Sequence, residues 1–427
     1  MVTDTFQVSS SDTSSLSIVI DSNNIPYIAY QDTGYENRVS VSKYTGLGWE
    51  PVGEPGFSAG AATYISMAID KNDSLYVAFV DAANYGKATV MQYNGVEWVI
   101  VGNAGFSAGA VGYTSIAVDS YNMPYVAFDG DGPVFKATVM KFNGSNWVTV
   151  GSPGFSAGNA LFTSIVLDSF NMPYVSYEDM PYSYKATVMK FNGTNWTTVG
   201  SPGFSAGGVN YITMAIDSNN TPYVAYQDSG NGAKATVMKF NGANWVPVGT
   251  PGFSAGEVFF PSIAIDRNNI PYVVYQDIES RARVTVMKFN GAGWENVGNA
   301  GFSPSTASDT TIALDKNNTP YIAYHDVSQN VIVMKYTGTS WETVGCPISS
   351  LQPSAGAFVL RILADEAQII RCLRIFFCRT LQELAAERCL STERKVNTAG
   401  ELIGAAAQKE AALAAVIEAA SKFSASQ

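Results

Sequence analysis

From Phe6 to Gly345 the chain repeats one pattern of hydrophobic and polar positions every 49 residues. Each copy holds four short segments that are rich in β-branched and aromatic residues and are bounded by Gly, Asn, Pro or Ser, a pattern typical of strands joined by turns. In the copy that begins at Tyr211, we expect strand a at 211–217, strand b at 223–228, strand c at 233–240 and strand d at 245–249.

Three residue types recur at fixed places in all seven copies, except that the last tryptophan comes two residues early. The tryptophans are Trp49, Trp98, Trp147, Trp196, Trp245, Trp294 and Trp341; the aspartates are Asp21, Asp70, Asp119, Asp168, Asp217, Asp266 and Asp315; the tyrosines are Tyr27, Tyr76, Tyr125, Tyr174, Tyr223, Tyr272 and Tyr321. Seven four-stranded units of this length predict an all-β fold, a seven-bladed β-propeller. We interpret the aspartates as caps of the a–b turns and the tryptophans as core between blades. No strand is left over at either end, so blades one and seven should close the ring by face packing.

Two segments of the repeat carry a resemblance to known families. The a–b hairpin, for example 115–119 followed by 124–128, resembles the hairpin of NHL-type propellers. The whole repeat, with Ala-Thr-Val-Met-Lys-Phe-Asn-Gly and Val-Gly-x-x-Gly-Phe-Ser-Ala-Gly, is similar to tandem repeats of secreted bacterial surface proteins. The resemblance covers residues 6–345 and implies the propeller fold and an extracellular or cell-surface location, although a cytoplasmic one stays open.

The sequence predicts one binding face. The a–b and c–d turns hardly vary between copies, whereas the b–c and d–a segments, which emerge together on the opposite face, vary freely. Variable loops on a fixed scaffold are where binding residues are usually found. Five copies place an aromatic residue on this face, which could stack on a sugar or anchor a peptide; the alternative is that it fills gaps between blades. These candidate ligand-binding residues are Tyr64, Tyr113, Phe162, Tyr211 and Phe260.

Six copies also place an aspartate directly after strand b, and these carboxylates are further candidates for ligand binding. They are Asp32, Asp81, Asp179, Asp228, Asp277 and Asp326. A basic residue faces this position across the b–c hairpin in six copies, so cross-strand ion pairs are the structural alternative. The basic residues are Arg38, Lys87, Lys136, Lys185, Lys234 and Arg283.

Composition and charge narrow the function. A net charge of −11 and a pI near 4.7 argue against nucleic-acid partners, which require clustered Lys and Arg. We expect no transmembrane helix and no signal peptide in this chain, and the lack of Cys/His spacings, Gly-rich phosphate loops and calcium loops predicts no metal and no cofactor. The one histidine, His325, occupies a position that holds Gln in other copies, so we expect no catalytic role for it and no catalytic residues.

Our main expectation is therefore a non-enzymatic binding or scaffolding propeller that binds a protein or a glycan on the b–c/d–a face. One alternative is a carbohydrate-binding lectin with repeated sites. The other is a glycosidase-like or sialidase-like hydrolase, which would lack the expected arginine cluster. Composition divides the chain into a propeller over 1–346, a linker over 347–355 and an α-helical hairpin over 356–427. The hairpin carries an apolar stripe that favours association with another chain, and a homo-oligomer is one form that this association could take.

Overall fold

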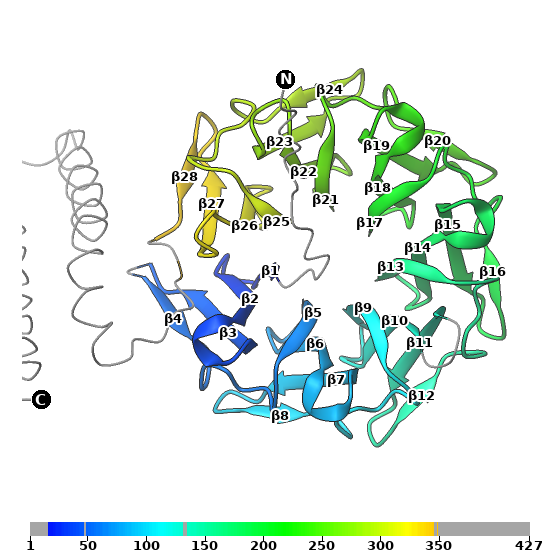
Figure 1. The fold of residues 1–427 in the computed structure, drawn as a ribbon, viewed down its shortest axis with the longest axis vertical. Helices are drawn as coiled ribbons and strands as arrows, with labels where there is room; N and C mark the ends of the chain where they lie inside the picture. Colours follow the sequence, from blue (N-terminus) through cyan, green and yellow to red (C-terminus); the bar gives the residue numbers. More distant parts are fainter. Residues whose placement is uncertain (1–15, 47, 131–134, 346–347, 349–427) are drawn as a thin grey trace, which may run out of the picture. The chain divides into compact units, whose positions relative to one another are not determined.

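The structure, a computed structural model, describes residues 16–46, 48–130, 135–345 and 348. The chain divides into two units, 1–350 and 351–427, and every described residue belongs to the first. The described residues form seven separate four-stranded antiparallel sheets around a common centre (Figure 1). This confirms the seven-bladed β-propeller. The helical hairpin predicted for 356–427 lies outside the described residues, and the domain boundary at 347–355 stays a prediction.

Each blade is one contiguous piece of chain, and its four strands follow one another in the sheet in sequence order. The first strand of every blade lies nearest the centre (Figure 1). These inner strands are β1 (Leu16–Ile20), β5 (Ala62–Ile69), β9 (Val111–Val118), β13 (Ala160–Leu167), β17 (Val209–Ile216), β21 (Val258–Ile265) and β25 (Ser308–Leu314). The second strands are β2 (Pro26–Asp32), β6 (Leu75–Asp81), β10 (Pro124–Gly130), β14 (Pro173–Asp179), β18 (Pro222–Asp228), β22 (Pro271–Asp277) and β26 (Pro320–His325).

The third strand of each blade is followed by a shorter outermost strand at the edge of the sheet. The third strands are β3 (Arg38–Tyr44), β7 (Lys87–Tyr93), β11 (Lys136–Phe142), β15 (Lys185–Phe191), β19 (Lys234–Phe240), β23 (Arg283–Phe289) and β27 (Val331–Tyr336). The outermost strands are β4 (Trp49–Pro51), β8 (Trp98–Ile100), β12 (Trp147–Thr149), β16 (Trp196–Thr198), β20 (Trp245–Pro247), β24 (Trp294–Asn296) and β28 (Trp341–Thr343). Within the described residues, four b–c connections contain a single 3₁₀ turn: η1 (Thr33–Tyr35), η2 (Ala82–Asn84), η3 (Met180–Tyr182) and η4 (Ser229–Asn231).

The hydrophobic core lies between neighbouring blades. Each second strand is buried on both faces, because the alternate Val, Ala and Tyr side chains of one sheet pack on the next sheet. The tryptophans join the blades in the same way: Trp196 donates its indole N–H to the carbonyl oxygen of Val150 at 2.7 Å, and the Phe155 ring stacks on it with centroids 4.0 Å apart. The prediction that the tryptophans pack between blades is confirmed.

The first and last blades close the ring with contacts of the same kind. One buried cluster contains Ile18 and Ile28 of blade one together with Val333 of blade seven. The Trp49 indole donates to the Val344 carbonyl oxygen at 2.7 Å. Since each described sheet consists of strands from one blade only, closure depends on face packing, as the sequence predicted.

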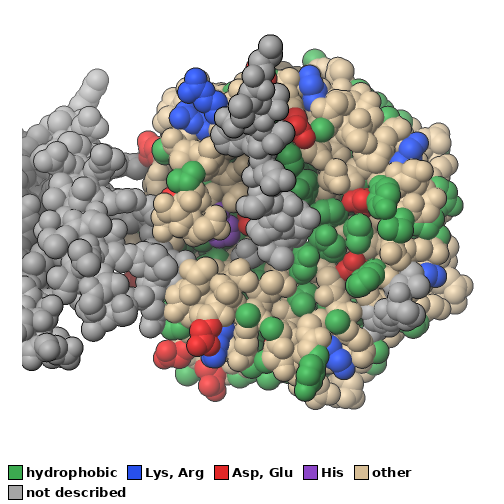
Figure 2. All heavy atoms as spheres, in the orientation of Figure 1, with side chains coloured by type: hydrophobic (Ala, Val, Ile, Leu, Met, Phe, Trp, Pro, Cys, Tyr) green, Lys and Arg blue, Asp and Glu red, His purple; other side chains and the backbone are tan. Residues whose placement is uncertain are grey.

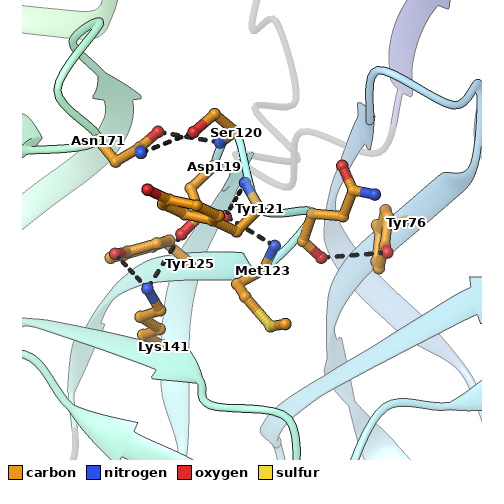
Figure 3. Close-up of polar contacts among 9 residues, drawn as sticks. Tyr76, Asp119, Ser120, Tyr121, Met123, Tyr125, Lys141 and Asn171 are labelled. Atoms are coloured by element: carbon orange, nitrogen blue, oxygen red, sulfur yellow. Dashed lines mark hydrogen bonds and ion pairs between the residues drawn. The ribbon is translucent and has the colours of Figure 1, made fainter.

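The invariant aspartates cap the a–b turns, which lie on the face of the ring opposite to the b–c loops (Figure 3). Asp119 Oδ1 accepts hydrogen bonds from the backbone N–H groups of Tyr121 and Met123, both at 2.9 Å. The next blade adds a clamp, because Asn171 Oδ1 accepts from the Ser120 backbone N–H at 2.9 Å. The Asp column is thus structural, in agreement with the sequence interpretation. Among the described residues no helix is long and apolar enough to cross a membrane.

Candidate functional site: an aromatic cavity on the propeller axis

A β-bulge in the inner strand turns one residue of each of six blades out of the regular strand geometry. The register of β9 against β10, for example, shifts between the pairs at Ala127 and Asp129. The residues at this place have left-handed backbone angles, with φ between 47° and 54°: Tyr64, Tyr113, Phe162, Tyr211, Phe260 and Asp309. Aromatic residues seldom adopt this conformation, and a strained backbone repeated at one place is a reason to examine that place for function.

The five aromatic rings that the sequence singled out form one continuous chain around the axis. Neighbouring ring centroids lie 4.6, 4.5, 5.1 and 4.9 Å apart from Tyr64 through to Phe260, with the planes tilted by 45–59°. These are favourable separations and orientations for aromatic pairs. The structure therefore brings the five predicted aromatic residues together, each from a different blade.

The rings line a cavity of about 230 Å³ to which all seven inner strands contribute. The same three positions recur in six of these strands, for example Tyr113, Thr114 and Ser115 in β9, and the described part of β1 contributes Leu16 and Ser17. On the face drawn in Figure 2, hydrophobic side chains gather toward the middle and Lys and Arg side chains lie nearer the rim. Because drug-sized ligands usually occupy about 300–1,000 Å³, this cavity suits one small ring.

Threonine hydroxyls from the next blade hold the bulges in place. Thr163 Oγ1 donates to the carbonyl oxygen of Tyr113 at 2.6 Å, and Thr310 Oγ1 donates to that of Phe260 at 2.6 Å. Thr114 makes the same contact with the Tyr64 carbonyl. The backbone that orients these rings is therefore fixed by contacts between blades, which preorganises the cavity.

Blade seven interrupts the aromatic chain with an acid that sequence reasoning missed. Asp309 stands 49 residues after Phe260 and lines the cavity; its side chain is 10% exposed, and its Oδ2 lies 3.3 Å from Nδ1 of His325, whose side chain is 6% exposed. Extending the aromatic column by one more repeat would have found Asp309. The position in blade one falls on residue 15, outside the described residues.

Five of the six candidate aspartates end the second strands and Asp326 directly follows β26, and none of the six belongs to the cavity lining. In blade two, Asp81 Oδ1 accepts from the Ala83 backbone N–H at 3.0 Å, and Oδ2 accepts from the Thr89 hydroxyl at 2.8 Å. Asp32 and Asp228 make equivalent contacts, whereas Asp277 keeps the threonine contact and Asp326 caps a shorter turn. These five carboxylates shape the loops, whereas both oxygens of Asp179 lack a hydrogen-bond partner among the described residues, because Pro181 has no N–H to donate at the capping position.

The expected cross-strand ion pairs do not form. Asp32 faces Arg38 in register, and Asp81 faces Lys87, but within the described ranges no such pair comes to salt-bridge distance; Arg38 pairs with Glu36 instead. The physical reason is that the aspartates are buried, with Asp81 only 1% exposed. The hydroxyl on strand c and the loop N–H groups reach them inside the blade, while the basic residues at the start of strand c remain partly exposed.

Two further acids are buried between blades without a polar partner for one of their oxygens. Glu178 Oε2 and Asp129 Oδ1 accept no hydrogen bond from the described residues. Burial raises the pKa of each carboxyl to about 7. In blades one and five, Gln31 and Gln227 occupy the same position and donate to a carbonyl oxygen of the next blade at 2.7 and 2.6 Å, an interaction that a charged carboxylate cannot make.

A second hollow of about 620 Å³ lies on the opposite face, between blades four and five. Its lining includes the a–b turn at Asn219 and Asn220, the c–d turn at Asn241, and Lys190, whose ammonium lies 4.6 Å from the centre of the Tyr174 ring. The sequence reasoning placed binding on the other face and did not anticipate this groove. No three His, Cys, Asp or Glu side chains in the described part of the chain converge as metal ligands would.

No protein-family model matches the chain, and no curated protein is significantly similar to it in sequence. Solved structures are similar in fold. The BP39L lectin from Burkholderia pseudomallei is 15% identical over 79% of this chain and 99% of that chain, with a TM-score of 0.56. An ulvan lyase of polysaccharide lyase family PL25 is 14% identical over 76% and 92%, with a TM-score of 0.52. The Aleuria aurantia lectin is 16% identical over 68% and 96%, with a TM-score of 0.46. At these identities the likeness concerns the fold alone.

Proposed function

We propose that this propeller is a lectin-like module that binds carbohydrate in its central aromatic cavity. The observation that carries the proposal is the chain of five aromatic rings, from Tyr64 to Phe260, on strained and clamped backbone around a cavity of about 230 Å³. The C–H face of a sugar ring is apolar and packs on aromatic side chains, while its hydroxyls need a few polar groups at the edge. Ser and Thr hydroxyls and Asp309 stand among the aromatic residues that line the cavity.

The similar folds support a carbohydrate over a protein partner. One is a lectin, and the ulvan lyase has been solved bound to a saccharide of glucuronic acid and sulfated rhamnose. This choice departs from our main sequence expectation, which left protein and glycan equal, and favours the lectin alternative. It also departs from that alternative in one respect, because the cavity on the axis is a single site and not a repeated one.

The cavity size predicts a weak site for a single sugar. A monosaccharide has roughly a dozen non-hydrogen atoms, and at about 0.3 kcal/mol for each the binding free energy is about −4 kcal/mol, or a Kd of about 1 mM. Useful affinity would then require several propellers on a multivalent surface. The association that we predict for residues 356–427 would supply this, and it remains a proposal about a segment outside the described residues.

A glycan array followed by NMR titration of the hits tests the proposal. We expect Tyr113→Ala to weaken binding about 10-fold, since the loss of one aromatic contact removes about 1–1.5 kcal/mol. Tyr113→Phe is the matched variant, because Phe stands at this position in blades four and six. Tyr121→Ala, which removes a side chain 73% exposed in an a–b turn, should leave binding unchanged.

The same samples separate a lectin from an enzyme. We propose that the propeller is not an enzyme, so hits from the array should be recovered intact after prolonged incubation with the protein. Release of products from chromogenic glycosides or from a polysaccharide would favour the hydrolase or lyase reading. Equal binding by wild type and Tyr113→Ala would remove the cavity as the site.

A further inference from the structure

Of the six inner strands whose bulge lies within the described residues, five present an aromatic residue to the cavity and that of blade seven presents an acid. Asp309 has the same bulged backbone as its five aromatic counterparts, with φ of 50°, and it lines the same cavity. Its side chain is nine-tenths buried. Oδ1 accepts no hydrogen bond from any described residue. A buried acceptor without a donor is costly unless a ligand supplies one.

His325 gives this carboxylate a neighbour that no other blade offers. Blades one, five and six carry Gln at the position of His325, and those glutamines reach across to a carbonyl oxygen of the next blade. The imidazole instead lies beside Asp309, with Nδ1 3.3 Å from Oδ2. This approach is not a hydrogen bond, and Oδ1 is buried and also has no donor among the described residues, so the carboxylate keeps its accepting capacity for a ligand hydroxyl that reaches it.

The charge around the cavity is of one sign. The residues that line it include no Lys, Arg or Glu, and Asp309 is their one carboxylate. An anionic sugar would bring a second negative charge into a largely enclosed space, where the repulsion between like charges is stronger than in water. A site that places a like charge against one class of ligand disfavours that class.

We propose that Asp309 is the specificity-determining residue of the cavity, that it accepts a hydrogen bond from a hydroxyl of an uncharged sugar, and that it excludes uronic acids and sulfated sugars. His325 is a positioning residue, which acts through Asp309. The inference rests on the proposed carbohydrate site, and it specifies the class of sugar that this site binds. The sugar stacks on the aromatic side of the cavity and turns its hydroxyl edge toward blade seven, so one molecule binds per propeller.

The test compares neutral methyl glycosides with methyl glucuronides and sulfated glycosides, by NMR titration of the full chain. Wild type should bind a neutral glycoside and show at least 10-fold weaker binding of the glucuronide of the same configuration. Asp309→Asn keeps the shape and removes the charge. It should weaken the neutral ligand by about 10-fold, because a hydrogen bond to a charged group is lost, and it should largely abolish the discrimination against the glucuronide.

His325→Gln is the matched variant, since three other blades fold with Gln at this place. It should weaken the neutral ligand while keeping the exclusion of glucuronide, because the charge of Asp309 remains. Thermal unfolding verifies that each variant is folded. If Asp309→Asn does not fold, Asp309→Phe, which introduces the residue of blade six, replaces it.

The outcomes separate this inference from the proposed function. If wild type binds neutral sugar and Tyr113→Ala does not, but Asp309→Asn leaves the preference between neutral and anionic sugars unchanged, the role of Asp309 is overturned and the cavity stands. Preferential binding of the glucuronide by wild type overturns it as well. If wild type binds no sugar, or Tyr113→Ala binds as well as wild type, the proposed function itself fails.

Discussion

Replacing Glu178 by Gln should stabilise the propeller above neutral pH and have little effect in acid. Glu178 is 5% exposed between blades four and five, and its Oε2 has no partner among the described residues. The glutamines at this position in blades one and five donate to the Ala62 and Val258 carbonyl oxygens. By the same spacing Glu178 faces the Val209 carbonyl, to which only a protonated acid or an amide can donate.

The size of the effect follows from the pKa. Burial raises the pKa of Glu178 from an ordinary 4.5 to about 7, and at about 1.36 kcal/mol per pKa unit this corresponds to about 3 kcal/mol. Because the folded-state pKa is above that of the unfolded chain, the unfolded chain loses its proton first as the pH rises. The contribution of Glu178 to stability is therefore fully present below pH 4.5, falls between pH 4.5 and 7, and is lost above pH 7.

Urea unfolding of wild type and Glu178→Gln at several values between pH 4.5 and 8 measures the difference. We expect the variant to be more stable by about 2–3 kcal/mol at pH 8 and nearly equal at pH 4.5. Taking the difference between the two proteins removes the separate contribution of Asp129. The converse variant, Gln227→Glu, should lose stability mainly at high pH. A stability difference that does not change with pH would refute the reasoning.

Three further predictions concern single contacts and the tail. Trp196→Ala should lower the free energy of unfolding by about 3–5 kcal/mol, because it removes the indole contacts with Val150 and Phe155 between blades. Phe170→Ala, which removes a side chain 72% exposed, is its control in the same denaturant titration. Equal unfolding midpoints for the two variants would show that the tryptophans are not core. Pro181→Ala should stabilise blade four by about 1 kcal/mol at pH 7, because Pro181 lacks the backbone N–H that, at Gly34 and Ala83, caps the corresponding aspartate, and the gain from a hydrogen bond to the buried carboxylate of Asp179 should exceed the loss of proline rigidity. The gain should be smaller at pH 4, because burial raises the pKa of the uncapped Asp179. Destabilisation at both pH values would contradict this prediction. Deleting 351–427, which keeps Ile348 and its pairing with Val331, should leave a folded monomer while the full chain associates, as measured by light scattering; two monomers of equal stability would remove the role of the tail.

The fold could be predicted from the sequence because the repeat reports each structural contact seven times. The Trp and Asp columns mark the contact between blades and the a–b turn cap, and both roles appear in the structure. The aromatic column could be predicted as well, but whether it filled gaps or lined a cavity could not. The choice between these two roles depended on the left-handed backbone at residues such as Tyr113. Aromatic residues have no preference for this conformation, so the sequence did not indicate it.

The polar part of the site was harder to predict. Asp309 is a departure from a column of Phe and Tyr, and a search for recurring residues overlooked it; His325 was recognised as a departure from a column of Gln, but the sequence did not place it beside Asp309. The loop aspartates misled for the opposite reason, since Asp81 recurs with a basic partner in register yet bonds to a hydroxyl and a backbone N–H inside the blade. Side-chain burial, which sequence spacing does not report, decided between these partners.

A crystal structure of the protein soaked with a neutral sugar selected on the glycan array tests the central claim most directly. The account predicts one sugar per propeller, with its ring against the aromatic residues between Tyr64 and Phe260 and a hydroxyl at Asp309. Sugar bound only in grooves between blades on the opposite face, such as the hollow at Asn219 and Lys190, with the axial cavity empty, would contradict it.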